Sequence, residues 1–365
     1  MINVLHVMDA ADGGISAVVK NWYENIDRDK IRFDIASTNS RVGMNVQRMR
    51  ELGANIYFLP LKSVDVKAYD IGLATLIRNG RYDVIHVHEN ETSFVGLRVA
   101  RASGVRKRIA HSHTSSPQIS LKSEIKRLLG CLLNYHYATE VIACGSLAGE
   151  RVFGKWNMKK SHFHIIRNAI DTTRYAFSLS RRMCIREELG VDDKIVLGMV
   201  GRLSPEKNVL FALEILANIR ANNRNMVLIL VGDGPDRAEI TETIRNKGLQ
   251  DAVIMLGMRS DVSELYSTMD IFMLPSIHEG FPVVAIEAMT SGLPLMVSDS
   301  VTKELSFYSD IVYLSIDKPA IWADYIKNRI SNHGTEKREK AYLNMQGSEF
   351  DIKMSVKKLE EIYLQ

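Results

Sequence analysis

Short apolar runs alternate with amphipathic stretches along this chain, and that alternation constrains its fold more than any other feature. In the first half the runs suit buried strands, and the segments between them carry apolar residues at helical spacing. The expected strands are Ile2–Met8 and segments near Ile31–Ala36, Asn55–Leu59, Asp83–His88, Arg108–His111 and Glu140–Ala143. Strand–helix–strand alternation of this kind predicts an α/β fold with a largely parallel, doubly wound sheet.

A second series with the same alternation follows in the other half of the chain. Near Asn168–Arg186 the pattern breaks into a polar, arginine-rich segment that we interpret as a linker. The later expected strands are Ile195–Val200, Met226–Val231, Val253–Leu256, Ile271–Leu274, Leu295–Val297 and Ile311–Leu314. Apolar residues at helical spacing predict an amphipathic helix for the tail, Asp351–Leu364. A chain of 365 residues can form two domains, so we expect two Rossmann-like halves in tandem.

Composition places the chain among ordinary globular proteins and favours a cytoplasmic location. Hydrophobic residues make up 46% of the chain and charged residues 25%, which is typical of a globular domain. The three cysteines, Cys131, Cys144 and Cys184, are too widely spaced for a disulfide framework or a metal site. No apolar run reaches the roughly 18 residues that span a bilayer, and the N-terminus has the pattern of a first strand rather than a signal peptide.

The stretch Asp270–Asp299 contains a strand, a loop and a helix with two glutamates. Glu279 follows the expected strand Ile271–Leu274 in a loop, and Glu287 lies on the helix after it. Pro282 suits the first turn of that helix, where a missing N–H is tolerated. The carboxyl edge of an open α/β sheet is where ligands bind, and a helix N-terminus there favours a phosphate.

Two further loops at strand ends are candidates for contact with phosphate. Arg202 and Lys207 lie five residues apart after the strand Ile195–Val200, and both side chains suit a phosphate, although taken alone they are more consistent with two surface cations on a solvated loop. The segment 232–234 reads Gly-Asp-Gly and resembles part of a dinucleotide fingerprint, but Arg237 stands where its third glycine belongs, so a tight turn is the better interpretation.

Four histidines cluster near strand ends in the first half. His86 and His88 form one H-x-H pair, and His111 and His113 form another. Such pairs are seen in metal sites, but no cysteine or carboxylate beyond Glu89 completes a ligand shell here. We therefore expect no metal, and interpret these histidines as hydrogen-bonded core residues or as residues that face a substrate.

Taken together, the motifs resemble those of one enzyme family. In order they are Gly-Gly-Ile after the first strand, HSHTSS, IIRNAID, GRLSPEKN, LVGDGP, LGMRSD and EGFPVVAIEAM, the last with its E-x7-E pair. Over nearly the whole chain this set resembles glycosyltransferase family 4, retaining nucleotide-sugar enzymes of the GT-B fold. RIAHSHTSS and LPLMVSDSVTKEL are similar to the branch that builds bacterial capsular polysaccharides and exopolysaccharides.

The resemblance implies a domain organisation. Two Rossmann-like domains would face each other across a cleft, and the C-terminal helix would return to the N-terminal domain. Residues 1–170, with the helix at about 349–365, would bind the acceptor, and residues 171–348 would bind the nucleotide-sugar.

The resemblance also implies roles for individual residues. Four would be catalytic: Arg202 and Lys207 would hold the donor diphosphate, Glu279 would contact the donor sugar, and His113 would face that sugar near the reacting carbon. The remaining donor contacts would come from Glu287 to the ribose, Gly14 over the diphosphate, backbone N–H groups of Phe281 and Val283 to the phosphates, and the loop with Met258 and Arg259 beside the base. Pro282 departs from the family pattern, because it replaces a common glycine and removes one N–H donor.

The implied reaction is metal-independent transfer with retention of configuration. The leaving phosphate would take the proton of the acceptor while Arg202 and Lys207 stabilise the separating charge. No cofactor is expected, and UDP is favoured as the nucleotide only by analogy with the branch. A GT-B nucleotide-sugar epimerase and a catalytically silent partner subunit remain as alternatives.

An uneven charge distribution gains a meaning from the resemblance. Between Ser93 and His164 twelve lysines and arginines stand against three glutamates. Acceptors in this branch are usually lipid-linked saccharides, so segments 121–133 and 155–160 are candidates for peripheral contact with the inner face of the plasma membrane. The alternative is a half-buried helix with a solvated basic edge. Nucleic acid is not expected, because no RNA- or DNA-binding motif accompanies the charge.

Overall fold

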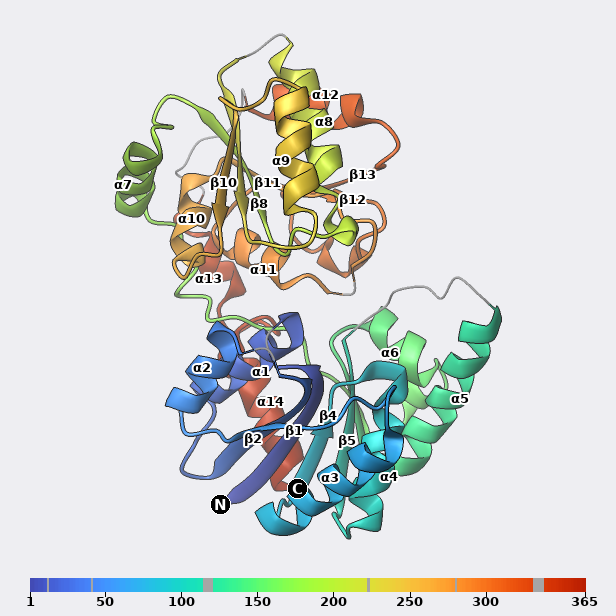
Figure 1. The fold of residues 1–365 in the computed structure, drawn as a ribbon. Helices are drawn as coiled ribbons and strands as arrows, with labels where there is room; N and C mark the ends of the chain where they lie inside the picture. Colours follow the sequence, from blue (N-terminus) through green and yellow to red (C-terminus); the bar gives the residue numbers. More distant parts are fainter. Residues whose placement is uncertain (12, 41, 114–120, 222–223, 280, 331–337) are drawn as a thin grey trace. The chain divides into compact units, whose positions relative to one another are not determined.

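A computed structural model describes the chain as two compact units (Figure 1). The first unit comprises Met1–Ala169 and Glu349–Gln365, and the second comprises Ile170–Ser348. The description covers all residues except 12, 41, 114–120, 222–223, 280 and 331–337, and it omits the side chains of 121–123 and 330. Each unit is described by itself below.

The first unit is built on a seven-stranded parallel sheet with the order β3-β2-β1-β4-β5-β6-β7. Its strands are β1 (Ile2–Ala10), β2 (Ile31–Asn39), β3 (Ile56–Phe58), β4 (Val84–Val87), β5 (Lys107–Ser112), β6 (Glu140–Ala143) and β7 (Phe163–Ile165). Its α-helices are α1 (Gly14–Asn25), α2 (Met44–Glu51), α3 (Val66–Gly80), α4 (Ser93–Ala102), α5 (Leu121–Tyr137), α6 (Ser146–Phe153) and α14 (Ile352–Leu364).

The second unit is built on a six-stranded parallel sheet with the order β10-β9-β8-β11-β12-β13. Its strands are β8 (Ile195–Val200), β9 (Met226–Val231), β10 (Val253–Gly257), β11 (Ile271–Leu274), β12 (Leu295–Ser298) and β13 (Ile311–Leu314). Its α-helices are α7 (Leu179–Leu189), α8 (Val209–Arg220), α9 (Arg237–Asn246), α10 (Val262–Thr268), α11 (Val283–Thr290), α12 (Pro319–Ile330) and α13 (Ala341–Met345). The predicted α/β class with two parallel sheets is confirmed.

The core of the second unit follows from helical spacing on α8. Its buried residues recur every three or four positions, so they lie on one stripe of the helix: Val209, Ala212, Leu213, Leu216 and Ile219. That stripe packs in one cluster with the apolar strands β8 and β9 and with Trp322 of α12. The strand-to-helix loop that precedes α8 is therefore anchored at both ends in the core.

The C-terminal helix α14 belongs to the first unit, as predicted. Asp351 caps it by accepting a hydrogen bond from the backbone N–H of Lys353. Its five expected apolar residues are all buried: Ile352, Val356, Leu359, Ile362 and Tyr363. Figure 1 shows α14 beside α1, and the Trp22 Nε1–H on α1 donates to the Ser355 hydroxyl at 3.0 Å.

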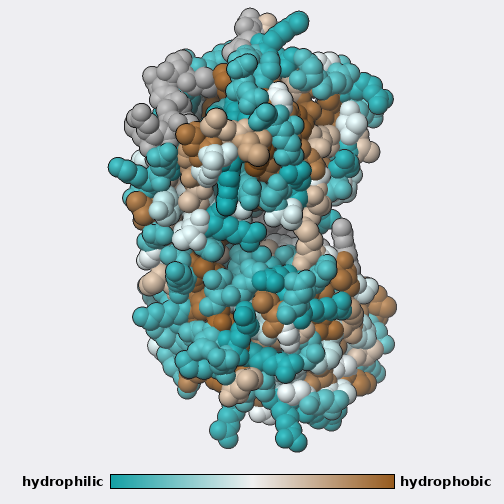
Figure 2. All heavy atoms as spheres, turned by 90° about the vertical axis from the view of Figure 1, so that its left-hand side faces the viewer, coloured by the Kyte–Doolittle hydropathy of each residue, from teal (hydrophilic) through white to brown (hydrophobic). Residues whose placement is uncertain are grey.

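The interpretation of the arginine-rich segment as a linker is wrong for its second part, which forms α7. Arg182 donates to the backbone carbonyls of Ser267, Thr268 and Met269, and both Arg182 and Arg186 pair with Asp270. From the sequence alone these arginines would be expected to face solvent, because these partners lie more than eighty residues further along the chain. On the faces of the units seen in Figure 2 hydrophilic groups predominate, with scattered hydrophobic groups between them.

Among the described helices, none combines the length and the apolar character that crossing a bilayer requires.

Candidate active site

The loop after β8 presents the two predicted cations. Arg202 is exposed and makes no ion pair with any described residue, whereas Lys207 ends a short 3₁₀ helix, Pro205–Lys207. The Lys207 ammonium forms a short ion pair with the Glu279 carboxylate, and both side chains are largely buried. The structure thus brings together three of the four predicted catalytic residues on one edge of the second sheet.

The glycines of the segment 232–234 shape this loop from the side of β9. A Cβ on Gly232 would stand 1.9 Å from the carbonyl oxygen of Gly201, and one on Gly234 would stand 2.1 Å from that of Leu203. Backbone hydrogen bonds join the same loops, from Gly201 N–H to the Val231 carbonyl and from Leu203 N–H to the Asp233 carbonyl. The glycines therefore serve close packing of two backbones, which holds Arg202 in place.

The loop between β11 and α11 is tied to the same 3₁₀ helix. The backbone N–H of Ile277 donates to the Glu206 carbonyl at 2.9 Å, and the Asn208 amide donates to the Pro275 carbonyl at 3.2 Å. The Ser276 hydroxyl donates to the Glu279 carboxylate at 3.1 Å. Two chain segments that lie far apart in the sequence thus form one edge that carries two cations and one carboxylate.

Glu287 is held by two tyrosines that the sequence analysis did not identify. The Tyr175 hydroxyl donates to its Oε1 at 2.9 Å, and the Tyr266 hydroxyl donates to its Oε2 at 2.6 Å. Burial and then the nearby Glu287 charge raise the pKa of both tyrosines well above the usual value, so both stay protonated donors. No motif links these three residues; only the fold brings them together.

The other predicted donor contacts lie on the same unit. Pro282 directly precedes α11, Val283 is the first residue of that helix, and Phe281 is buried. Met258 is exposed, and Arg259 forms a bidentate pair with Asp261 at 2.8 and 2.6 Å. Gly280, in the same loop as Glu279, lies outside the described residues.

Gly14 and His113 belong to the first unit. Gly14 starts α1 after β1, and a Cβ on it would meet no atom within 4 Å, so packing within the described protein does not require a glycine there. His113 follows β5 and is half-buried, and its backbone N–H donates to the Asn90 side chain at 2.8 Å. The Thr-Ser-Ser that completes the predicted histidine motif lies outside the described residues.

The predicted histidine cluster is larger than the sequence indicated, because His6 of β1 joins it. Ring nitrogens of His6, His86 and His88 lie within 4.8 Å of one another, and so do those of His88, His111 and His113. Either group has the donor atoms for a divalent metal. Within the described residues, however, six of these ring nitrogens already meet in three pairs at 2.8–3.0 Å, the distance of hydrogen bonds.

Two family descriptions match the chain, one in each half. Residues 12–174 match Glycosyltransferase Family 4, and residues 182–342 match Glycosyl transferases group 1. A protein named as a glycosyltransferase, EpsF of Bacillus subtilis, is 31% identical over 99% of this chain and 96% of its own length. The chain belongs to glycosyltransferase family 4. The prediction made from the motifs is confirmed.

Two other proteins extend the comparison over the full length. The capsular polysaccharide biosynthesis glycosyltransferase CapH of Staphylococcus aureus is 23% identical over all of this chain and 99% of its own. The structure of Anabaena HepE in complex with UDP-glucose superposes with a TM-score of 0.82 and 20% identity, over 99% of both chains. That similarity establishes that this glycosyltransferase shares the fold of HepE.

Proposed function

We propose that this protein transfers a sugar, with retention of configuration and without a metal, from a UDP-sugar to a saccharide or lipid-linked saccharide in the synthesis of a bacterial surface polysaccharide. The observation that carries the proposal is the edge formed by Arg202, Lys207 and Glu279. The UDP and UDP-glucose bound to HepE support the donor, and the likeness to CapH supports the product class.

The charges at this edge suit departure of a nucleoside diphosphate. Arg202 has no competing ion pair among the described residues, so its planar guanidinium is available for bidentate contact with a phosphate. Lys207 adds a second positive charge from the same loop. Both charges lie where the negative charge of the leaving diphosphate develops, which lowers the barrier by electrostatic stabilisation.

The paired carboxylate gives Glu279 a role other than acid–base catalysis. While the Glu279 carboxylate is paired with Lys207, its negative charge weakens the binding of a diphosphate to the Lys207 ammonium. We infer that the incoming diphosphate takes over Lys207 and that the Glu279 carboxylate then accepts a hydrogen bond from a hydroxyl of the donor sugar. Glu287, fixed by Tyr175 and Tyr266, would accept bonds from the ribose hydroxyls of the same donor.

Hydrolysis of nucleotide-sugars tests the proposal directly. Purified protein is incubated with UDP-, GDP- and ADP-sugars without acceptor, and release of the nucleotide is followed with and without EDTA. We expect slow release from a UDP-sugar that EDTA does not suppress. Arg202→Ala and Lys207→Ala should each reduce it about 10²-fold or more, since one stabilising charge is lost.

Arg220→Ala is the matched control, because Arg220 stands at the opposite end of α8 and pairs with Asp251. It should retain normal turnover. Near-normal turnover in both Arg202 and Lys207 variants would refute the proposed site. Inversion of the sugar at C2 instead of its release would indicate an epimerase, and no turnover of any nucleotide-sugar would favour a silent partner subunit.

We further propose that α5 binds the surface of an anionic membrane and that the protein meets its acceptor there. Ile125, Leu128, Leu129 and Leu132 on this helix are each more than half exposed, and Trp156 beyond α6 is 82% exposed. Lys159 lies 5.6 Å from the Trp156 ring centre. Exposed apolar side chains beside lysines suit the interface of an anionic bilayer better than a solvated helix edge.

A further inference from the structure

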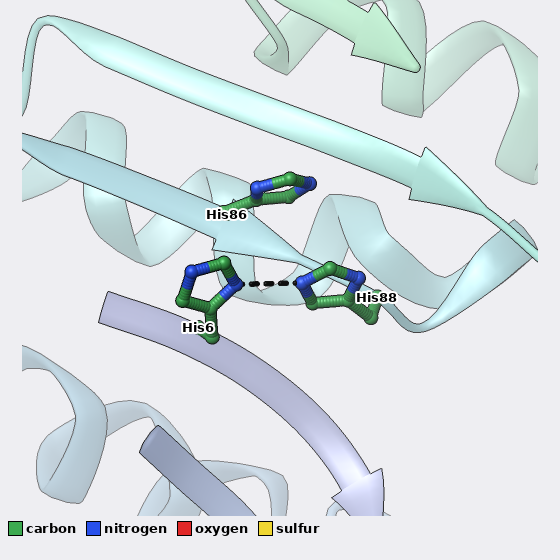
Figure 3. Close-up of side chains that lie close together, drawn as sticks. All are labelled: His6, His86 and His88. Atoms are coloured by element: carbon green, nitrogen blue, oxygen red, sulfur yellow. Dashed lines mark hydrogen bonds between the residues drawn. The ribbon is translucent and has the colours of Figure 1, made fainter. Parts of the chain in front are cut away.

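Five histidines form one layer on the sheet of the first unit. They come from three neighbouring strands and the residues that follow them: His6 on β1, His86 and His88 at β4, and His111 and His113 at β5. All except His113 are at most 1% exposed. Figure 3 shows three of them, with the His6 and His88 rings joined edge to edge. Trp22 of α1 stacks at 5.6 Å on the His111 ring, so the layer lies between the sheet and that helix.

The hydrogen bonds divide this layer into two separate strings. In the first, His6 Nδ1 meets His88 Nε2 at 2.9 Å, and His88 Nδ1 meets His113 Nε2 at 2.8 Å. In the second, the Tyr363 hydroxyl meets His86 Nδ1 at 2.7 Å, and His86 Nε2 meets His111 Nδ1 at 3.0 Å. Among the residues that the structure describes, no hydrogen bond joins one string to the other, and only the first string contains His113.

The rings of both strings are neutral at physiological pH. Burial lowers the pKa of His6 and of His113 to about 3. Burial, and then the proximity of the other rings, holds the pKa values of His86, His88 and His111 well below the ordinary value. A neutral imidazole carries one N–H and one lone pair, so it can donate on one side only and accept on the other.

This restriction couples the three rings of the first string. At each nitrogen–nitrogen contact one atom must carry the proton and the other must not. If His6 donates to His88, then His88 donates to His113, and the proton of His113 is on Nδ1. In the reverse direction the proton of His113 is on Nε2, and Nδ1 is bare. A mixed arrangement would leave two protons or two lone pairs facing each other at 2.8–2.9 Å.

We propose that His6 and His88 are positioning residues that hold His113 in a single tautomer and leave its Nδ1 as the only ring nitrogen able to meet a ligand. His113 Nε2 is engaged by His88, and at the far end of the string His6 Nε2 is buried with no hydrogen-bond partner among the described residues. An unpaired buried N–H at that end would cost more than a bare nitrogen, so His6 carries its proton on Nδ1 and donates to His88, and the proton of His113 is held on Nδ1.

The consequence is that His113 offers a substrate one fixed hydrogen-bonding character at the carboxyl edge of β5. It is a neutral positioning group for a hydroxyl or ring oxygen, and it stores no proton during turnover. Only the catalytic part of this inference rests on the proposed function, because the tautomer of His113 can be measured without any substrate.

Nitrogen NMR of the full-length protein labelled with ¹⁵N-histidine tests the inference. A single tautomer gives two widely separated ring ¹⁵N resonances for His113, whereas rapid exchange of tautomers draws them together. We expect wide separation in the unmodified protein. His88→Leu removes the ring that engages His113 Nε2, so the proton of His113 can then lie on either nitrogen and its resonances should converge.

Two further variants separate the string from general effects on the core. His6→Asn places an amide near the position of Nδ1, and its N–H can still donate to His88 Nε2, so the separation should be kept. Tyr363→Phe removes a buried hydrogen bond of the same layer but on the second string, so the His113 resonances should stay apart. Turnover of the donor should follow the same order, with a lowered kcat only in His88→Leu.

Several results would overturn the inference. Averaged His113 resonances in the unmodified protein would do so even if no variant folds, and so would unchanged resonances in a folded His88→Leu protein. A stoichiometric divalent metal in the purified protein would do so as well, because a coordinated nitrogen cannot take part in the string. If the NMR results hold while no nucleotide-sugar is turned over, the string stands and the proposed function fails.

Discussion

Lys207 has two anionic partners that compete for it, one in the protein and one in the proposed donor. Lys207 and Glu279 are both largely shielded from solvent. Removal of either side chain would therefore leave the charge of the other one poorly hydrated and unpaired. An ordinary surface pair would contribute little to binding or stability. This pair should instead set how tightly a diphosphate binds.

Glu279→Gln should therefore separate binding from transfer. The amide removes the competing charge, so UDP should bind at least as tightly as to the unmodified protein, while transfer or hydrolysis falls about 10²-fold through the lost contact to the donor sugar. Calorimetry with UDP and steady-state turnover measure the two effects. In a Lys207→Met background the effect of Glu279→Gln on UDP affinity should vanish, because the competition is gone. Weaker UDP binding in the single variant would contradict the competition.

Several site residues could be predicted from the sequence because local motifs carry them. Arg202 and Lys207 lie on one loop, and Glu279 is placed by the strand before it and the helix after it. Tyr175 and Tyr266 were not predictable, because their hydroxyls reach Glu287 from 112 and 21 residues away and no spacing rule connects them. His6 was missed for a similar reason, since it joins the cluster only through the pairing of β1 with β4.

At the scale of elements, buried strands were predicted most closely. β8, β9 and β11 have the expected bounds, because parallel strands covered on both faces are apolar throughout. The three-residue strand β7 was missed, because so short a segment carries no periodic signal. Helix α7 was hidden by arginines whose partners are distant in sequence. The local sequence pattern thus identifies elements whose own apolar residues form the core. It fails for elements that are held in place by polar contacts with residues distant in the sequence.

The close contact between the loops after β8 and β9 predicts that a larger residue at Gly232 lowers the stability of the second unit. Gly232→Ala would place a Cβ 1.9 Å from the Gly201 carbonyl oxygen at a φ of +130°, so the second unit should lose about 3 kcal/mol of unfolding free energy. The displaced loop should also weaken UDP binding. Urea unfolding and calorimetry measure the two effects.

Gly248→Ala is the matched control for that substitution. Gly248 has a φ of +63° in the same unit, but a Cβ there meets no atom within 4 Å. It should cost about 1–2 kcal/mol through backbone strain alone and leave UDP affinity unchanged. Equal effects of both substitutions on UDP affinity would show that the packing of the two loops does not position Arg202.

For the molecule as a whole, the histidine layer predicts a loss of stability at mildly acidic pH. The five pKa values are lowered in the folded state, so below the ordinary value of about 6.5 the unfolded chain binds protons that the folded chain does not. The free energy of unfolding therefore falls as pH falls from about 6.5 toward 3. Each proton contributes up to about 1.4 kcal/mol per pH unit.

Protonation of Glu89 has the opposite effect on stability, but it is one group against five histidines. Burial raises the pKa of the Glu89 carboxyl to about 7, although the Lys62 Nζ atom lies 2.7 Å from its Oε2 atom. Between about pH 4.5 and 7 the folded state therefore holds a proton on Glu89 that the unfolded state lacks. One such group opposes five histidines. Urea unfolding at pH 7.5, 6.5 and 5.5, followed by tryptophan fluorescence, should therefore give steadily lower stability. Constant or rising stability over this range would mean that the rings gain protons without unfolding.

Contact with a membrane is the remaining prediction for the whole molecule, and α5 offers a sharp comparison. Leu132 on α5 and Ile71 on α3 are both 67% exposed, but Leu132 shares its helix with the exposed Ile125, Leu128 and Leu129, whereas Ile71 shares α3 with one exposed large apolar residue, Val66, among the described residues. If α5 inserts into the interface, Leu132→Ser should reduce sedimentation with anionic liposomes several-fold, because burial of one leucine contributes about 1.5–3 kcal/mol. Ile71→Ser should have no effect, and Lys126→Glu should weaken binding to anionic vesicles and not to neutral ones. Equal recovery of all these proteins in the supernatant would instead make α5 a solvated helix edge and leave the acceptor to be found in solution.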